Sequence, residues 1–176
     1  VTGSDGTDTV DRCGIGGIAG EIRNSSIYQC YNKSQLGMAG SGACVGGIVG
    51  LSTISTVEKC YNTGIIYAKT CVGGISGYSA QLQIKWCYNM GDIIGKEDCV
   101  GGISGYMIPY YSKAYIGNVL YYCYNKGTVS GTSNVGSING LFDYCVIDYV
   151  YSLTGAFTKQ WGSVGNYDEA TNQGIY

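Results

Sequence analysis

The sequence predicts an all-β protein, folded as a right-handed parallel β-solenoid (a β-helix) of about five to six coils of ~27–30 residues. Two short blocks alternate along most of the chain. The first contains Gly-Gly, the second reads Cys-Tyr-Asn, and 14 residues separate the first glycine from the next cysteine in the first three units. Such a period is typical of stacked structural units. The first block begins at Gly16, Gly46, Gly73, Gly101 and, in the weaker form GSING, Gly136, and the second begins at Cys30, Cys60, Cys87 and Cys123.

The composition of the blocks indicates strands. They are rich in Val, Ile, Tyr and Gly, in short runs that end at Gly, Asn or Ser. No stretch carries an apolar stripe at helical spacing over three turns. One unit is too short to bury its own apolar face, so neighbouring units have to stack, with their strands about 4.8 Å apart. Crossover connections between parallel strands favour right-handed winding.

The repeats divide the chain into three parts. Residues 13–157 are expected to form the solenoid, and residues 1–12 are expected to be a lead-in or part of a preceding coil. Residues 158–176 indicate an atypical terminal coil or cap, in which Trp161 helps to cover the last coil, because the end units of solenoids depart from the repeat. We also expect the chain to be a segment of a longer protein.

Two apolar positions recur in the first block, three residues apart. A straight strand would point them to opposite faces, so we expect the Gly-Gly pair to bend or bulge the strand and to let both reach the core. The residue after the second position is expected to tolerate solvent. The three sets are Ile15, Val45, Val72, Val100 and Val135; Ile18, Ile48, Ile75, Ile103 and Ile138; and Ala19, Val49, Ser76, Ser104 and Asn139.

The second block supplies a column of tyrosines and a column of asparagines. Asparagine bonds to its local backbone, so Asn-x-Gly predicts a corner. Stacked asparagines are expected to bond to each other along the rod, and tyrosine rings at the coil spacing are expected to stack. Both columns are expected to hold the rod together. Their members are Asn32, Asn62, Asn89 and Asn125, and Tyr31, Tyr61, Tyr88, Tyr124 and Tyr151.

The segments VGGIVG at residues 45–50 and CYNTGIIYA at residues 60–68 resemble the GLUG motif, a repeat of bacterial surface and secreted proteins. The resemblance covers about residues 14–157, in five units. It implies a β-solenoid in a secreted or cell-surface protein, beside adhesive or enzymatic modules, and it implies no catalytic residues. The first unit departs from the pattern, because Asn32-Lys33-Ser34 stands where later units have Asn-x-Gly.

The nine cysteines allow three interpretations. Disulfides between the two columns would each stabilise the fold by roughly 2–4 kcal/mol. Alternatively, the columns are ladders of buried thiols, which pack as small apolar groups. A metal site is disfavoured because the chain has no histidine and no C-x-x-C pair. The columns are Cys30, Cys60, Cys87 and Cys123, and Cys44, Cys71 and Cys99, while Cys13 and Cys145 are candidates for an unpaired thiol. The candidate disulfides are 44–60, 71–87 and 99–123 within units, or 30–44, 60–71 and 87–99 between units.

The composition argues against several classes of function. The net charge is -2 and no basic stripe exists, so we expect no nucleic-acid partner, and no apolar run is long enough for membrane insertion. The absence of histidine removes the commonest general base, and no arginine lies near the pair Glu97 and Asp98, so we expect no enzyme and no cofactor. The spacing of Asp5, Asp8 and Asp11 does not match a calcium loop. Charged residues make up only 12%, which favours an extracellular or cell-surface location.

A binding function is expected in the fourth unit, where 22 residues rather than 14 separate Gly101 from Cys123. Extra residues in one solenoid unit form a loop on one face, and tyrosine-rich loops make good contact surfaces. The other interpretation is that the insertion folds back and covers the side of the rod. The candidate residues for binding a glycan or a host-surface protein are Tyr106, Tyr110, Tyr111, Tyr115, Tyr121 and Tyr122.

The sequence thus predicts a non-catalytic structural segment, a rigid spacer or scaffold, of a secreted or surface bacterial protein. Two alternatives stay open. One is an adhesin-type binding module that uses the Tyr-rich loop at residues 106–122. The other is a self-assembling extracellular fibre subunit that stacks end to end, since the open ends of a solenoid can pair with another copy.

Overall fold

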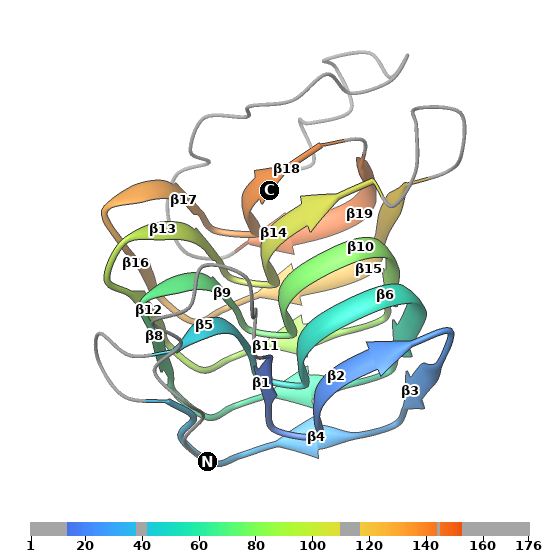
Figure 1. The fold of residues 1–176 in the computed structure, drawn as a ribbon, viewed down its shortest axis with the longest axis horizontal. Helices are drawn as coiled ribbons and strands as arrows, with labels where there is room; N and C mark the ends of the chain where they lie inside the picture. The colour runs from blue at the N-terminus through green and yellow to red at the C-terminus, as the bar shows by residue number, and fades with distance from the viewer. Residues whose placement is uncertain (1–13, 38–41, 110–116, 144, 153–176) are drawn as a thin grey trace.

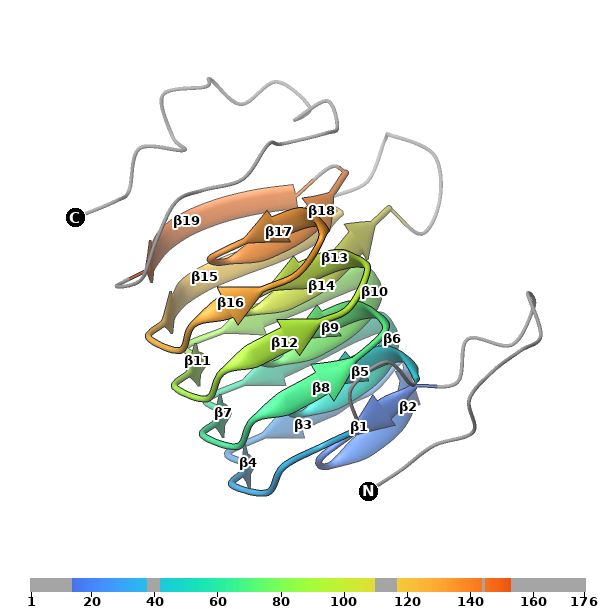
Figure 2. The same ribbon diagram turned by 90° about the vertical axis from the view of Figure 1, so that its left-hand side faces the viewer.

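Every regular element of the described chain is a β-strand, and all strand pairs are parallel, which confirms the predicted all-β solenoid. The computed structural model describes residues 14–37, 42–109, 117–143 and 145–152. Strands of successive coils lie directly above one another along one axis (Figures 1 and 2). The described residues make about 4 turns, fewer than the five to six expected. The expected lead-in at 1–12 and terminal coil at 158–176 lie outside the described residues.

The strands of the first block form the first sheet. Their register aligns Val45 with Val72 and Gly46 with Gly73, so every coil places the same residue type at the same position. Each strand therefore ends at the first glycine of its Gly-Gly pair. In spatial order the strands are β1 (Ile15–Gly16), β5 (Ala43–Gly46), β9 (Thr70–Gly73), β13 (Asp98–Gly101) and β17 (Ser133–Gly136).

The largest sheet wraps around two sides of the rod. Its long strands β6 (Val49–Glu58) and β10 (Ser76–Lys85) pair with each other on both sides of a bend. The remaining strands pair with these two or extend the sheet beyond them. They are β2 (Ala19–Arg23), β3 (Ser26–Tyr28), β4 (Tyr31–Asn32), β7 (Tyr61–Asn62), β11 (Tyr88–Asn89), β14 (Ser104–Ile108), β15 (Asn118–Asn125), β18 (Asn139–Phe142) and β19 (Cys145–Ser152).

A small third sheet closes the coil. It consists of β8 (Ile66–Ala68), β12 (Ile93–Gly95) and β16 (Val129–Ser130), which follow the Asn-x-Gly corner of the second block. Ile66 and Ile93 of this sheet pack with the valines of the first sheet in one apolar cluster. The third sheet therefore completes the wall that encloses this part of the core.

Residues with a left-handed backbone make the other corners. A positive φ is uncommon in residues other than glycine and reverses the local direction of the strand. Because it recurs at equivalent positions, each coil bends in the same places. One column precedes the first block, a second bends the long strands, and a third precedes the cysteine of the second block. The columns are Cys44, Cys71, Cys99 and Asn134; Asn24, Ile54 and Gln81; and Gln29, Lys59, Trp86, Tyr122 and Tyr149.

The two apolar columns of the first block enter two separate clusters. The valine column lies between the first and third sheets, and the isoleucine column lies inside the largest sheet. The expected bend at Gly-Gly is present, because β5 ends at Gly46 and β6 begins at Val49. In the first coil Ile18 is 45% exposed rather than buried, since no described coil covers its N-terminal side.

One expectation about the first block is wrong. The column after the isoleucines was expected to tolerate solvent, yet Val49, Ser76, Ser104 and Asn139 are all buried. The reason is the corner at the second glycine, which turns this position inward as the new strand starts. Small residues suit the position because the walls of the rod approach closely there. The hydroxyl of Ser104 has no hydrogen-bond partner.

Candidate functional site

The asparagines of the second block form a continuous hydrogen-bonded ladder inside the rod. The side-chain amide of Asn32 donates to Oδ1 of Asn62 at 2.7 Å. Asn62 donates to Asn89, and Asn89 donates to Asn125, each at 2.8 Å. All four side chains are buried. The ladder therefore links four successive coils by direct bonds between identical side chains.

Each asparagine also closes its own corner. The Nδ2 group of Asn89 donates to the carbonyl oxygen of Gly91 at 2.7 Å, and the Gly91 amide donates back to Oδ1 of Asn89 at 3.3 Å. Asn62 and Gly64 repeat this pair of bonds at 2.8 and 3.2 Å. One buried side chain thus satisfies the backbone of its corner and holds the coil above it.

The second glycine of each Gly-Gly pair packs against the asparagine of the same coil. A Cβ at Gly47 would lie 2.6 Å from Cγ of Asn62, and a Cβ at Gly74 would overlap Cγ of Asn89. The Cβ at Gly74 would also overlap the carbonyl oxygen of Gly102 in the next coil. Only glycine leaves room for the asparagine here. This contact across the coil explains why the two sequence blocks repeat in phase.

The glycine of Asn-x-Gly has a different neighbour. A Cβ at Gly91 or Gly127 would overlap the carbonyl oxygen of the equivalent glycine in the preceding coil. A Cβ at Gly64 would overlap the carbonyl oxygen of Ser34. Ser34 fills this position in the first unit, where no coil of the described chain lies on its N-terminal side. The departure from the repeat at Ser34 therefore has a steric explanation.

The tyrosine column forms a stack of nearly parallel rings on the outside of the rod. The ring centroids of Tyr31 and Tyr61 are 5.1 Å apart, and those of Tyr61 and Tyr88, and of Tyr88 and Tyr124, are 4.9 Å apart. The angles between the planes are 10° or less. Burial between its neighbours raises the pKa of Tyr88, and the phenols of Tyr124 and Tyr61 add to the effect. We call these four residues the tyrosine ladder.

A second aromatic group lies at the left-handed corner just before the cysteines. Tyr122 stacks on Tyr149 at 4.6 Å and on Trp86 at 6.3 Å, with planes within 10° of parallel. Tyr121 meets Trp86, Tyr122 and Tyr149 edge to face. A hydrogen bond with Tyr121 raises the pKa of Tyr122. We call Trp86, Tyr121, Tyr122 and Tyr149 the aromatic corner.

Lys59 extends the aromatic corner toward the first coil. Its ammonium group donates to the hydroxyl of Tyr28 at 3.0 Å and lies over the rings of Tyr28 and Trp86, 5.1 and 5.7 Å from their centroids. A weak ion pair joins it to Glu58 at 3.7 Å. The hydrogen bond with Tyr28 raises the pKa of Lys59. The lysine therefore stays charged and, from the second coil, bridges aromatic groups of the first and third coils.

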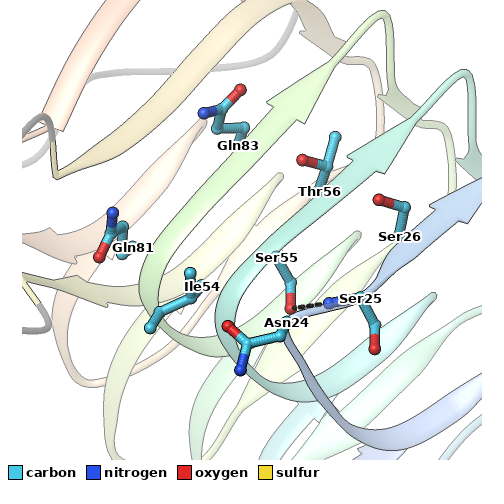
Figure 3. A pocket seen from close by; sticks show the side chains of 8 residues that line it. All are labelled: Asn24, Ser25, Ser26, Ile54, Ser55, Thr56, Gln81 and Gln83. Atoms are coloured by element: carbon cyan, nitrogen blue, oxygen red, sulfur yellow. Dashed lines mark hydrogen bonds between the residues drawn. The ribbon is translucent and has the colours of Figure 1, made fainter.

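A polar groove of about 370 Å³ lies on the same side of the rod. Side chains from the bend of the largest sheet line it, and all but one are amides or hydroxyls (Figure 3). One wall is held by the backbone amide of Ser25, which donates to the hydroxyl of Ser55 at 3.2 Å. The lining residues are Asn24, Ser25, Ser26, Ile54, Ser55, Thr56, Gln81 and Gln83.

The structure separates the tyrosines of the fourth unit. Tyr106 lies on β14, half-buried, with its ring edge to face against Tyr78 at 5.5 Å. Tyr121 and Tyr122 lie on β15, beyond the bend, in the aromatic corner. The described tyrosines of the predicted loop therefore do not share one surface, because Tyr106 and the pair Tyr121 and Tyr122 lie on opposite sides of the bend. The other three candidates, Tyr110, Tyr111 and Tyr115, lie outside the described residues.

Asn118 closes the base of the insertion. Its Nδ2 group donates to the carbonyl oxygen of Ile108 at 2.8 Å, and its Oδ1 accepts from the Leu82 amide at 2.9 Å and from the Ser79 hydroxyl at 3.3 Å. These neighbours flank Gln81, the corner residue of the preceding coil. The eight extra residues thus leave and rejoin the solenoid at a bend, where the strands are already interrupted.

Of the interpretations left open for the cysteine columns, the structure agrees with the thiol ladders. The eight described cysteines form no disulfide, so the candidate pairs within and between units are not confirmed. The physical reason is the register, because each column stacks on itself: Cys60 lies beside Cys87, whose sulfur accepts a bond from the Cys60 amide at 3.4 Å. The two columns occupy different corners of the coil. Cys145, which fits neither column in sequence, is buried near Met107, and Cys13 lies outside the described residues.

Burial and mutual contact shift the ionisation of these thiols. A hydrogen bond with Cys87 lowers the pKa of Cys60 to about 7. Burial raises the pKa of Cys87 and of Cys145, and it raises the pKa of Cys123 to about 12. A hydrogen bond with Cys71, followed by burial, raises the pKa of Cys99. Most of the ladder is therefore neutral at pH 7.

Raising the pH above about 9 is expected to destabilise the fold. A thiol in the unfolded chain ionises near pH 8.5, whereas Cys87, Cys123 and Cys145 resist ionisation in the folded rod. A raised pKa gives stability that is complete below the unfolded pKa and is lost as the pH approaches the folded pKa. Cys123, whose folded pKa is about 12, should lower the free energy of unfolding by about 1.4 kcal/mol per pH unit between roughly pH 9 and 12, and Cys87 and Cys145 should act in the same direction. Urea unfolding from pH 7 to 11 measures this slope.

Cys123→Val is the control for the alkaline effect. Valine fits the column, because Val150 is the register partner of Cys123 in the next coil. Without this thiol, the loss of stability above pH 9 should be smaller by about 1.4 kcal/mol per pH unit. Equal slopes for the variant and the parent chain would contradict the assignment of the slope to this thiol.

The adjacent acids of the fourth coil have structural partners. Asp98 accepts hydrogen bonds from the Ser133 hydroxyl at 2.9 Å and from Nδ2 of Asn134 at 2.6 Å. Burial alone would raise the pKa of Asp98, but these bonds outweigh it and lower the pKa. Glu97 lies 3.6 Å from the ammonium group of Lys69. Within residues 14–152, as far as they are described, no group of three or more His, Cys, Asp or Glu side chains is placed to hold a metal ion.

The contacts between coils are those of a structural repeat protein. The described chain is a parallel β-solenoid whose recurring side chains are used to join coil to coil, as in structural repeat modules. No helix of the described part is long and apolar enough to cross a membrane.

The comparison with protein families gives one match, to Glug, the GLUG motif, at residues 41–67. This stretch contains the Gly-Gly pair at Gly46 and the Cys-Tyr-Asn block at Cys60, and it ends within strand β8. The match supports the predicted GLUG resemblance for this unit, and the unit's blocks align in register with those of the coils before and after it. Searches of curated proteins and of solved structures gave no match.

Sequence reasoning missed the aromatic corner as a unit. Trp86 and Tyr149 were not among the candidates, although both directly precede the position of the repeat cysteine, where Tyr122 also stands. Counting positions back from each cysteine would have aligned them. No repeated sequence pattern indicated the polar groove, because its residues differ from coil to coil.

Proposed function

We propose that this segment is a non-catalytic rigid module, a spacer or scaffold, of a secreted or surface bacterial protein. The observation that carries the proposal is the uninterrupted asparagine ladder, in which direct side-chain bonds run from Asn32 to Asn125. A spacer has to keep its length and direction under load. Bonds that link every coil to the next serve that purpose.

The sheets support the same proposal. Each inner coil pairs with the coil before and the coil after it, as β10 does with β6 and β14. Backbone hydrogen bonds between parallel strands run across the strands, and here that direction is along the rod. Nearest-neighbour contacts of this kind make stability a property of the stack rather than of one coil.

The proposed location rests on surface chemistry. Charged residues make up 12% of the chain, and most exposed positions of the described residues carry uncharged side chains, with Tyr, Asn, Ser, Thr and Gln among them. Six of the eight described thiols are buried, which keeps them from oxidants outside the cell. The GLUG motif is also a repeat of surface and secreted proteins.

Single-molecule force spectroscopy tests the rigid-module proposal. The full chain is held between two folded handle domains and pulled at both ends. We expect no extension until discrete events, each of which releases one or more coils, or roughly 100 Å for a ~29-residue unit. Smooth lengthening at low force, without discrete events, would overturn the proposal.

A further inference from the structure

One side of the rod exposes aromatic residues in rows that follow the rod axis. The first row is the tyrosine ladder and the second is the aromatic corner with Tyr28 and Lys59. Trp86, Tyr122 and Tyr149 are 46%, 42% and 49% exposed, and Tyr31 and Tyr124 are also exposed. We call this surface the aromatic face. A cysteine that points inward separates the two rows in each coil, so they line the same corner.

The rings of the tyrosine ladder turn their edges outward. Their faces stack on one another at 4.9–5.1 Å, so neighbouring rings cover them. What remains for a ligand is the rim of each ring and its hydroxyl, repeated once per coil. Such a row offers one hydrogen-bond donor and acceptor per step of the solenoid. The ladder therefore does not present flat ring faces to a ligand.

The polar groove continues this surface across the same strands. Ser26 and Tyr28 alternate with buried Ile27 on β3, and Thr56 and Glu58 share a face of β6 in the same way. Residues two apart on one face of a strand are about 6.6 Å apart. The groove therefore leads directly into the rows of the aromatic face, and it adds amides and hydroxyls to the phenols.

The net charge of the aromatic face is small. The row beside the aromatic corner carries Glu58, Lys85 and Asp148 in register, Lys59 lies between them and the tyrosines, and Lys33 lies over the ring of Tyr31 at 4.9 Å. Three positive and two negative groups, spread over several coils, give little net attraction for an anion or a cation. The groove itself contains no charged residue. A ligand that fits this chemistry is uncharged, elongated and rich in hydroxyl groups.

We propose that the aromatic face and the polar groove bind an extended, uncharged polysaccharide that lies along the rod axis. A β-1,4-linked chain of six-membered sugars advances per sugar by nearly the coil spacing, so successive sugars meet equivalent side chains. Tyrosine hydroxyls bond to the sugar hydroxyls of the chain that follows the ladder, and the amides of Gln81 and Gln83, on a parallel path in the groove, bond to those of a neighbouring chain. A protein partner is disfavoured, because protein interfaces depend on aromatic or apolar anchors seated in pockets, and this face offers ring rims.

The test uses the full chain and four probes, namely microcrystalline cellulose, chitin, cross-linked dextran and a protein-coated surface. We expect retention on cellulose or chitin, and weak retention on the flexible α-linked dextran. The variant Tyr61→Phe/Tyr88→Phe/Tyr124→Phe removes three hydroxyls and keeps the ring stack. It should bind about tenfold or more weakly, because the loss of each hydroxyl bond weakens binding by about two- to tenfold and three are lost together.

Tyr67→Phe is the matched control, since Tyr67 is a half-exposed tyrosine on β8 in the third sheet, away from the aromatic face. It should bind like the parent chain, and circular dichroism should show both variants folded. Failure to bind cellulose and chitin would overturn the proposal. So would equal binding by the triple variant, equal retention on dextran, or retention on the protein-coated surface alone. None of these outcomes bears on the rigid-module proposal, which the pulling experiment tests separately.

Discussion

Replacing Asn89 with alanine is expected to lower the free energy of unfolding by about 3–5 kcal/mol. The side chain bonds to Asn62 and Asn125 in the adjacent coils and exchanges two bonds with Gly91 in its own corner. Alanine restores none of these, and the Gly91 amide is left without its side-chain partner in a buried corner. A loss of this size is a large part of the roughly 5–15 kcal/mol that stabilises an ordinary domain. Urea unfolding followed by circular dichroism measures it.

Asn32→Ala is the matched control for the ladder. Asn32 occupies the first described coil, bonds to Asn62 on one side only, and closes its corner with Ser34. Its loss should cost less than that of Asn89, because Asn32 makes three such bonds rather than four and no second asparagine depends on it as a hydrogen-bond acceptor. Equal costs at the two positions would show that local corner bonds, rather than the ladder, provide the stability.

Replacing Gly74 with alanine is expected to prevent the fourth coil from docking on the third. The new methyl group would overlap Cγ of Asn89 and the carbonyl oxygen of Gly102. A clash with backbone cannot be relieved by a change of side-chain rotamer, so the walls of the coil have to separate. We expect a loss of at least about 3 kcal/mol, at the upper end of what overpacking costs. Thermal unfolding and proteolysis should both show it.

Two comparisons make the result at Gly74 specific. Gly20→Ala should be milder, because its methyl group would lie 2.7 Å from one carbonyl oxygen, that of Gly14, in the first described coil. Combining Gly74→Ala with Asn89→Ala should not restore stability, since the overlap with Gly102 remains. Recovery in the double variant would mean that the asparagine side chain is the only obstacle at Gly74.

The fold was predictable because a solenoid repeats its chemistry in the sequence. Gly46 and Gly73, or Asn62 and Asn89, recur at intervals that match one turn, and the structure aligns each pair in register. Short Val, Ile and Tyr runs indicated strands, and the family match at residues 41–67 covers one complete pair of blocks. The burial of Val49 and Ser76 was not predictable in the same way, because it depends on how sharply the chain turns at the preceding glycine.

The candidate site was less accessible to sequence reasoning. The insertion drew attention to six tyrosines, but Tyr106 lies on one side of the bend and Tyr121 and Tyr122 on the other. Trp86 and Tyr149 join the latter two through stacking between coils. Their shared position before the repeat cysteine aligns Trp86, Tyr122 and Tyr149 in the sequence, but the contacts between their rings depend on the angle of the corner. The proposed polysaccharide surface depends on this arrangement of rows and on the direction in which the rings are stacked.

The sequence alone determined the period, the strand composition and the identity of the recurring columns, because each column reports the same place in every turn. The tertiary structure alone decided what each column touches. Cys60 was expected to reach the other cysteine column, and instead it lies beside Cys87 of the next coil. The reason is geometric. Left-handed residues such as Lys59 set the angles between the walls, and these angles determine which columns meet across the rod and which only stack along it.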